Sequence, residues 1–322
     1  MPLPFVQAEW IGVGKQYIVE NLPEYVSDAK EALLKIPRSF EATYIPQDEL
    51  VVNQFIKKDI PTQSAELWPI KAADCFSPNN PTIAWDMLAR RTVPSSQILT
   101  TLESALGQAW FDGAKSVIDW RYNDGQEYLP FWVIQYWRRI SVVSRKQMTW
   151  SRAVNWIEKN LRSSKPHEEK MENALEKVFP IFDHLPWNTP LPYLRRNVTT
   201  ADLAPFLGTN WLNDDHINMM VEDINHRISL NKNLRGKILV APLVFATNIQ
   251  LNRGSKYLDR IVQMVASKEL EKLYFPVNIN ENHWITAYVD FTAHSFGYGR
   301  IGRGQWLKSI DYTYRRLIVK SV

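Results

Sequence analysis

The sequence predicts an α+β protein in which a mostly helical region is followed by a region of mixed helices and strands. Between residues 94 and 186, apolar side chains recur at the three- and four-residue spacing of one-sided helices. Between residues 273 and 290 they alternate with polar ones, as in half-buried strands. The intervening segment 185–194 contains three prolines, which end helices because proline has no backbone donor. We therefore predict a helical region of unknown role over 1–190 and a second region over 205–322.

Several helices are expected in the first region. One covers residues 23–36, and another begins at Ser95 or Ser96, either of which can cap it. The apolar stripes of the later helices are Ile98, Leu99, Leu102 and Leu106; Trp150, Ala153, Val154, Ile157 and Leu161; and Met171, Ala174, Leu175, Val178 and Phe179.

Composition excludes several classes of protein and site. The 322 residues contain one cysteine, Cys75, so no internal disulfide and no cysteine-based zinc site can form, which fits a reducing compartment. The formal net charge of +4 does not by itself require a nucleic-acid partner. The sequence has no signal-peptide pattern and no run of about 20 apolar residues that could span a membrane. We expect a protein of the nucleus or cytoplasm with no cofactor and no metal.

The second region is expected to begin with a helix and to continue into paired strands. Asp214 and Asp215 open the helix, where acidic side chains favour the positive end of the helix dipole. Strands follow at 273–279 and 284–290, joined by a polar turn at 280–282. The predicted apolar face of the helix consists of Ile217, Met220, Val221, Ile224 and Ile228. In the second strand, one face carries Ile285, Ala287 and Val289, and the other carries Trp284, Thr286 and Tyr288.

His283 stands at the start of the second strand, directly before Trp284. An imidazole held at a rigid strand end can act as a general base. A histidine in this place can equally serve the turn alone through a hydrogen bond, because histidine has many structural roles. The motifs around His283 favour the first reading.

Three motifs occur in order in this region. Residues 211–214 (Trp-Leu-Asn-Asp) open the helix, residues 275–279 (Phe-Pro-Val-Asn-Ile) lie in the first strand, and His283 and Trp284 begin the second, which ends at Asp290. Together they resemble the family of cysteine proteases that mature or remove SUMO-type ubiquitin-like proteins. The resemblance implies a partial papain-like fold and a ubiquitin-like modifier, or its conjugates, as partner.

The resemblance implies roles for four residues. His283 matches the general base that takes a proton from a cysteine thiol, after which the thiolate attacks the carbonyl that follows a diglycine. Trp211 and Trp284 match the walls of a tunnel that admits only a Gly-Gly tail, because a larger side chain would collide with an indole. Core packing is the alternative role for both tryptophans. Asp214 matches a substrate-binding position and can also act as a simple helix cap.

Two departures from the family pattern predict that the chain as given is inactive. Arg300 stands at the position of the family's aspartate, and a guanidinium cannot accept the imidazole N–H. Asp290 is the nearest carboxylate, but it would lie about 20 Å from His283 at ~3.3 Å per strand residue. The family's glutamine and its Asp-Cys-Gly nucleophile do not occur, and Cys75 lies outside the resemblance, where we expect a small buried side chain. These departures predict a truncated pseudoenzyme.

A different class of function is suggested by residues 136–166. They contain eight basic residues and one acidic residue, with Trp137, Trp150 and Trp156 interleaved. Basic and aromatic side chains together can bind single-stranded nucleic acid, whereas a solvated helix face explains the same charges without a partner. The alternative is therefore a non-catalytic, mobile-element-derived protein that binds nucleic acid or a ubiquitin-like protein, with any nucleic-acid contact being weak.

Overall fold

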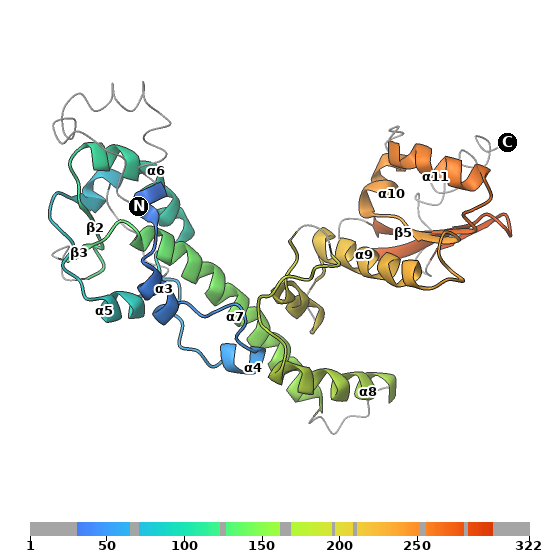
Figure 1. Ribbon diagram of the computed structural model, residues 1–322, viewed down its shortest axis with the longest axis horizontal. Helices are drawn as coiled ribbons and strands as arrows, with labels where there is room; N and C mark the ends of the chain where they lie inside the picture. The colour runs from blue at the N-terminus through green and yellow to red at the C-terminus, as the bar shows by residue number, and fades with distance from the viewer. Residues whose placement is uncertain are drawn as a thin grey trace. The chain divides into compact units, whose positions relative to one another are not determined.

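The computed structural model describes residues 31–64, 71–122, 127–161, 169–194, 197–208, 211–250, 256–279 and 283–298. The chain divides into two compact units, Met1–Thr189 and Pro190–Val322 (Figure 1). The helix expected at 23–36 lies mostly outside the described residues, although 31–34 are helical. Within the described ranges, no helix combines the length and apolar character needed to cross a membrane.

One long helix, α7 (Val133–Leu161), runs through the first unit. It packs against α6 (Ser96–Phe111), α8 (Glu169–Val178) and the 3-10 turn η4 (Phe179–Asp183) (Figure 1). As predicted, Ser95 caps α6, and its hydroxyl accepts a hydrogen bond from the Ile98 N–H at 3.4 Å. The shorter elements are α3 (Arg38–Tyr44), α4 (Val52–Phe55), η2 (Ala72–Cys75) and α5 (Trp85–Arg90).

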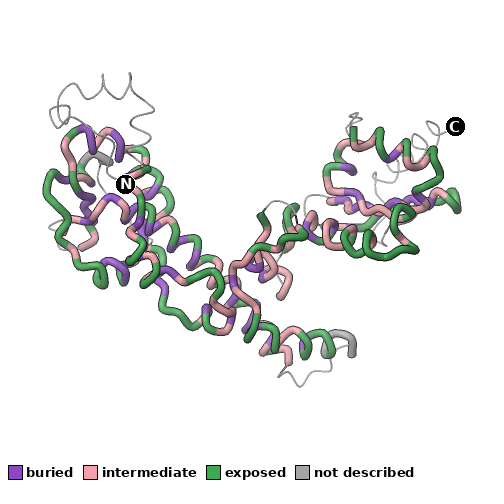
Figure 2. Tube along the Cα trace, viewed as in Figure 1, coloured by how far each residue is buried: buried purple, intermediate pink, exposed green. Residues whose placement is uncertain are grey.

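The apolar stripes predicted from the sequence mostly form the core of this unit (Figure 2). The stripe at 150–161 is the C-terminal part of α7 and not a separate helix. In α8, Leu175 is buried but Ala174 is exposed, so this stripe is narrower than predicted. The fully buried members of the other two stripes are Leu99, Leu102, Leu106, Trp150, Ala153, Val154 and Ile157.

Trp187 completes the core beside α7. Its side chain is 1% exposed and stacks on Phe55, with ring centroids 4.0 Å apart and an interplanar angle of 8°. Its indole N–H donates to the Gln47 carbonyl at 2.8 Å, and the Trp150 indole N–H donates to the Trp187 carbonyl at 3.2 Å. Because each buried N–H has an acceptor, the indoles are buried without the cost of an unpaired polar group.

The first unit also contains a small antiparallel sheet that the sequence did not predict. Its strands, β1 (Phe76–Ser77), β2 (Ser116–Ile118) and β3 (Tyr128–Leu129), pair in that order. The buried Asp119 follows β2, and its carboxylate accepts two hydrogen bonds from the Arg121 guanidinium, at 2.8 and 2.7 Å. This bidentate pair neutralises a charge that would otherwise be costly to bury.

The second unit contains a four-stranded sheet in the order β4-β5-β6-β7. Strands β4 and β5 are parallel, and the other pairs are antiparallel. The register places Lys272 opposite Asp290 and Ile279 opposite His283, so the two predicted strands are confirmed, while the turn predicted at 280–282 lies outside the described residues. The strands are β4 (Ile238–Val240), β5 (Lys272–Ile279), β6 (His283–Asp290) and β7 (Ser295–Tyr298).

Helices α10 (Leu243–Gln250) and α11 (Lys256–Ala266) contribute to the core on one face of this sheet (Figure 1). The predicted alternation in β6 is confirmed, because Ile285, Ala287 and Val289 all join this core. The core consists of Ala241, Phe245, Ile261, Leu270, Leu273, Phe275, Val277, Ile285, Ala287 and Val289.

Helix α9 (Asp214–Leu230) packs against β4 and the start of α10 through two asparagines. The Asn225 side-chain amide donates to the Val240 carbonyl at 2.7 Å, and its oxygen accepts from the Val240 N–H at 3.0 Å. The Asn218 oxygen accepts from the Leu243 N–H at 3.4 Å. These side chains therefore satisfy backbone groups that have no strand partner.

The apolar face predicted for α9 is wrong in part. Val221 is buried as expected, but Met219 is buried in place of Met220, which is 43% exposed, and Ile224 is 41% exposed. The packed side of the helix must present Asn218 and Asn225 to the backbone of β4 and α10. This requirement turns part of the apolar stripe towards solvent, an outcome that helical periodicity alone does not reveal.

Candidate functional site

The candidate site lies at the start of β6, where His283 is exposed. His283 pairs with Ile279 of β5, and the next residue, Trp284, pairs with Asn278. Because side chains alternate along a strand, Trp284 lies on the face opposite the apolar core. The sheet thus fixes the backbone of both residues.

Trp284 joins the start of β6 to the segment before α9. Its indole N–H donates to the Leu212 carbonyl at 3.1 Å. The neighbouring Trp211 is 79% exposed, so its indole is not part of the core. The predicted residues Trp211, Trp284 and His283 therefore come from two chain segments that this hydrogen bond holds together.

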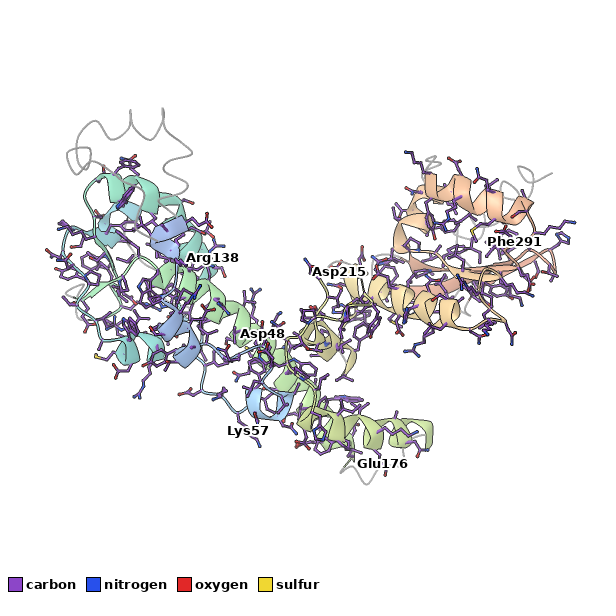
Figure 3. The ribbon with its side chains drawn as sticks, in the orientation of Figure 1. Asp48, Lys57, Arg138, Glu176, Asp215 and Phe291 are labelled. Carbon is purple, nitrogen blue, oxygen red and sulfur yellow. The ribbon has the colours of Figure 1, made fainter. Side chains whose placement is uncertain are left out.

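The N-terminus of α9 is fixed by a reciprocal cap. The Asn213 side chain accepts from the His216 N–H at 3.1 Å, and His216 Nδ1 accepts from the Asn213 N–H at 3.2 Å. Asp214 is the first residue of the helix, so the capping role considered for it belongs to Asn213. The Asp214 carboxylate is exposed beside the positive end of the helix dipole, where a ligand can reach it. Figure 3 labels the next residue, Asp215.

One polar group at the site was missed by sequence reasoning. The Asn278 side-chain oxygen is buried and has no hydrogen-bond partner among the described residues. A buried acceptor without a donor costs free energy, which a ligand N–H would recover. Asn278 belongs to the 275–279 motif and lies directly opposite Trp284 in the strand register. This register is the sequence signal that could have identified Asn278 as a site residue.

Asp290 takes no part in the site at His283. It lies at the opposite end of β6, where its carboxylate accepts from the N–H groups of Ala293 at 2.8 Å and Thr292 at 3.0 Å and pairs with Lys272 at 3.0 Å. The Ala293 hydrogen bond, followed by that from Lys272, lowers the pKa of the Asp290 carboxyl. Arg300, the residue predicted at the family's aspartate position, lies outside the described residues.

The lowered pKa of Asp290 predicts a pH effect on stability. The carboxylate's contribution is fully present above the pKa of the unfolded carboxyl, about 4, and is lost as pH falls through the lower folded value. We expect Asp290→Asn to reduce stability at pH 7 and to remove part of the acid-induced loss. Urea unfolding of both proteins between pH 7 and pH 3 would measure this, and parallel pH curves would contradict it.

Cys75 is remote from this site in the chain and chemically unsuited to nucleophilic attack. It lies in the first unit, is buried as predicted, and has its thiol within 3.8 Å of the Lys71 carbonyl. Burial, followed by the nearby Asp74 and Asp119 carboxylates, raises the pKa of the thiol to about 11. At neutral pH the group is therefore a thiol and not the reactive thiolate.

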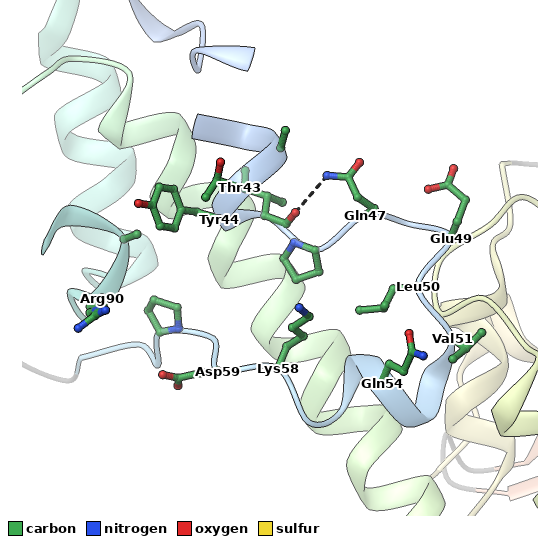
Figure 4. Close-up of a pocket in the computed structure, with 15 residues that line it drawn as sticks. Thr43, Tyr44, Gln47, Glu49, Leu50, Val51, Gln54, Lys58, Asp59 and Arg90 are labelled. Carbon is green, nitrogen blue, oxygen red and sulfur yellow. Dashed lines mark hydrogen bonds between the residues drawn. The ribbon is translucent and has the colours of Figure 1, made fainter. Parts of the chain in front are cut away.

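A separate pocket of about 670 Å³ lies in the first unit (Figure 4). Its wall includes two cations, Lys58 and Arg90, and two acids, Glu49 and Asp59. The Gln47 amide donates to the Ile45 carbonyl at 3.3 Å on its rim (Figure 4). In the part of the chain that the structure describes, no group of three or more histidine, cysteine or acidic residues could hold a metal ion.

Two of the three tryptophans predicted to accompany the basic run at 136–166 are withdrawn from solvent, while Trp156 is partly exposed. Trp137 and Trp150 are fully buried in α7 and cannot stack on bases. Arg138 pairs with Glu103, and Arg139 pairs with Glu41, so part of the basic charge is neutralised within the unit. The described geometry does not support a nucleic-acid contact by base stacking.

Comparison with known families identifies the class to which this site is similar. Residues 210–301 match the model of the Ulp1 protease family, C-terminal catalytic domain. This match supports the resemblance predicted from the sequence and covers all of the predicted site residues. No curated protein matches the chain.

Two solved structures are also similar to the chain at low identity. They are a SUMO protease Ulp1 with its catalytic cysteine oxidised to a sulfinic acid and the same protease with that cysteine oxidised to a sulfonic acid. Both are 18% identical, with TM-scores of 0.33 and 0.31, and the matches cover 52% and 49% of this chain. The chain spans 65% and 68% of the length of those two structures.

Proposed function

We propose that the second unit binds the C-terminal tail of a SUMO-type modifier and that the 322-residue chain does not cleave it. The observation that carries this proposal is the hydrogen bond from the Trp284 indole to the Leu212 carbonyl, which brings the exposed Trp211 next to the strand that begins with His283. Two indoles supplied by a rigid strand and by the segment before a capped helix can flank a tail that has no side chains.

Hydrogen-bonding capacity at the site supports a peptide tail as ligand. The unpaired Asn278 oxygen can accept a backbone N–H, and the exposed Asp214 carboxylate can accept from a cationic or amide donor. His283 is the residue assigned to general-base chemistry in this proposal, but a general base needs a nucleophile to deprotonate. Since Cys75 is the sole cysteine and is buried in the first unit, binding without cleavage is the proposed outcome.

Substitution of the tryptophans tests the proposal. We expect Trp211→Ala and Trp284→Ala each to weaken binding of a SUMO protein ending in Gly-Gly by about 30-fold or more, because aromatic anchors dominate such interfaces. Isothermal titration calorimetry and NMR shifts of the labelled modifier would measure the loss.

Leu230→Ala is the control, since Leu230 is 71% exposed in the same unit at the other end of α9. This variant should bind like the parent protein. A modifier that binds the parent protein and both tryptophan variants equally would place the interface elsewhere. A correctly folded parent protein that shows no binding would refute the proposed function.

A further inference from the structure

One face of α7 in the first unit carries cations that have no partner among the residues that the structure describes. We call it the basic ridge, and it spans about 26 Å from residue 142 to residue 159 at 1.5 Å per residue. Its residues recur every three or four positions and so form one row along the helix. The exposed residues of the ridge are Val142, Arg145, Met148, Arg152, Asn155 and Lys159.

The cations of α7 that lie outside the basic ridge do have partners. Outside the ridge, Arg138 and Arg139 have glutamate partners, and the Lys146 ammonium donates to the Asn188 side-chain oxygen at 2.7 Å. Figure 3 marks Arg138 on this helix. Among the described residues, the side chains of Arg145, Arg152 and Lys159 form no hydrogen bond or ion pair, and the ridge carries no acidic residue.

The ridge also has an apolar component that a purely electrostatic surface would not need. Val142 is 42% exposed and Met148 is 52% exposed, and both lie in the same row as the cations. Contact with a phosphate backbone would use the cations but would gain little from these two side chains. A protein partner with its own apolar stripe would use both.

The spacing of the cations matches the repeat of another helix. Arg145, Arg152 and Lys159 are separated by seven residues each, or about 10.5 Å along the axis. A partner helix with acidic side chains at every seventh position repeats at the same interval, so each carboxylate can meet one cation while apolar residues between them contact Val142 and Met148.

We propose that the basic ridge binds an acidic amphipathic helix of a partner protein. This inference is independent of the function proposed for the second unit. It differs from nucleic-acid binding by the same segment, because it relies on the apolar ridge residues and on a helical repeat, and because two of the three tryptophans considered for base stacking, Trp137 and Trp150, are buried.

A designed peptide tests this proposal with the full chain. The probe is a fluorescent 21-residue helical peptide with Glu at every seventh position and Leu four residues after each Glu. Fluorescence anisotropy should show binding to the parent protein. Combined replacement of Arg145, Arg152 and Lys159 by alanine should weaken it about tenfold, the sum expected of three exposed ion pairs. Met148→Ser should weaken it by a smaller but measurable factor.

The matched control replaces Lys35, Lys57 and Lys177 by alanine, which removes the same charge from exposed positions of the first unit. This control should bind the peptide like the parent protein, and circular dichroism should show that all variants are folded. If the control variant lost as much peptide binding as the ridge variant, the change in net charge alone would explain the effect, and the proposal would be overturned. Tighter binding of a 20-base-pair DNA duplex than of the peptide, unaffected by Met148→Ser, would overturn it in favour of a phosphate ligand. Absence of peptide binding would overturn it outright.

Discussion

The 322-residue chain is expected to leave a SUMO precursor uncut under conditions in which a Ulp1-type protease processes it completely. Cysteine protease chemistry requires a thiolate next to the general base. The sole thiol, Cys75, lies in the first unit, is buried, and has a pKa raised to about 11. Without a reactive thiolate, turnover by this chain should therefore stay at the uncatalysed rate, which gel analysis of the precursor and a fluorogenic diglycine substrate would both report.

Two variants separate the possible origins of any activity that is found. Cys75→Ser and His283→Ala should give the same baseline as the parent chain. Activity that disappears in Cys75→Ser would identify Cys75 as a nucleophile and contradict its assignment as a buried structural thiol. Activity that survives in Cys75→Ser but disappears in His283→Ala would point to hydrolysis without a thiol.

Trp187→Ala is expected to destabilise the first unit by about 3–5 kcal/mol, the range for removing a large buried aromatic side chain. The substitution removes the stack on Phe55 and leaves the Gln47 carbonyl without its indole donor. It also opens a cavity beside Trp150 on α7. Amide hydrogen exchange of α7 peptides, followed by mass spectrometry, would report the stability of this unit separately from the other.

Trp211→Ala is the control for this effect, because it removes the same side chain from an exposed position of the second unit. Its effect on stability should be within about 0.5 kcal/mol. Similar protection of α7 in the Trp187→Ala variant and in the parent protein would mean that the stacked pair contributes little to the core.

The sequence predicted elements whose apolar periodicity is long and regular. The strands now defined as β5 and β6 alternate over eight residues each, so their existence and their buried faces followed from the pattern. The three strands of the small sheet contain two or three residues each, too few to show a period, and their pairing depends on contacts distant in sequence. The face of α9 was misjudged because side-chain hydrogen bonds to backbone decide its orientation.

The candidate site was predictable in its residues but not in its contacts. Motifs at 211–214 and at His283 indicated which side chains to consider, and the resemblance to a family is what connected them. The hydrogen bond from Trp284 to Leu212 joins residues 72 positions apart, a separation over which local patterns carry no information. The capping partner His216 and the unpaired Asn278 oxygen likewise emerged only from the folded chain.

Asn225 affects the tendency of the edge strand β4 to pair with a strand of another molecule. Strand β4 pairs with β5 along one side, and the outward N–H and C=O of Val240 are both occupied by the Asn225 amide. The Ile238 N–H is likewise occupied, by the Leu234 carbonyl at 3.1 Å. An extended segment from another molecule would have to break these bonds before it could pair with this border. The Asn225 amide therefore forms the hydrogen bonds that a neighbouring strand would form with Val240. It protects the β4 edge from intermolecular strand addition, the first step of sheet-based aggregation.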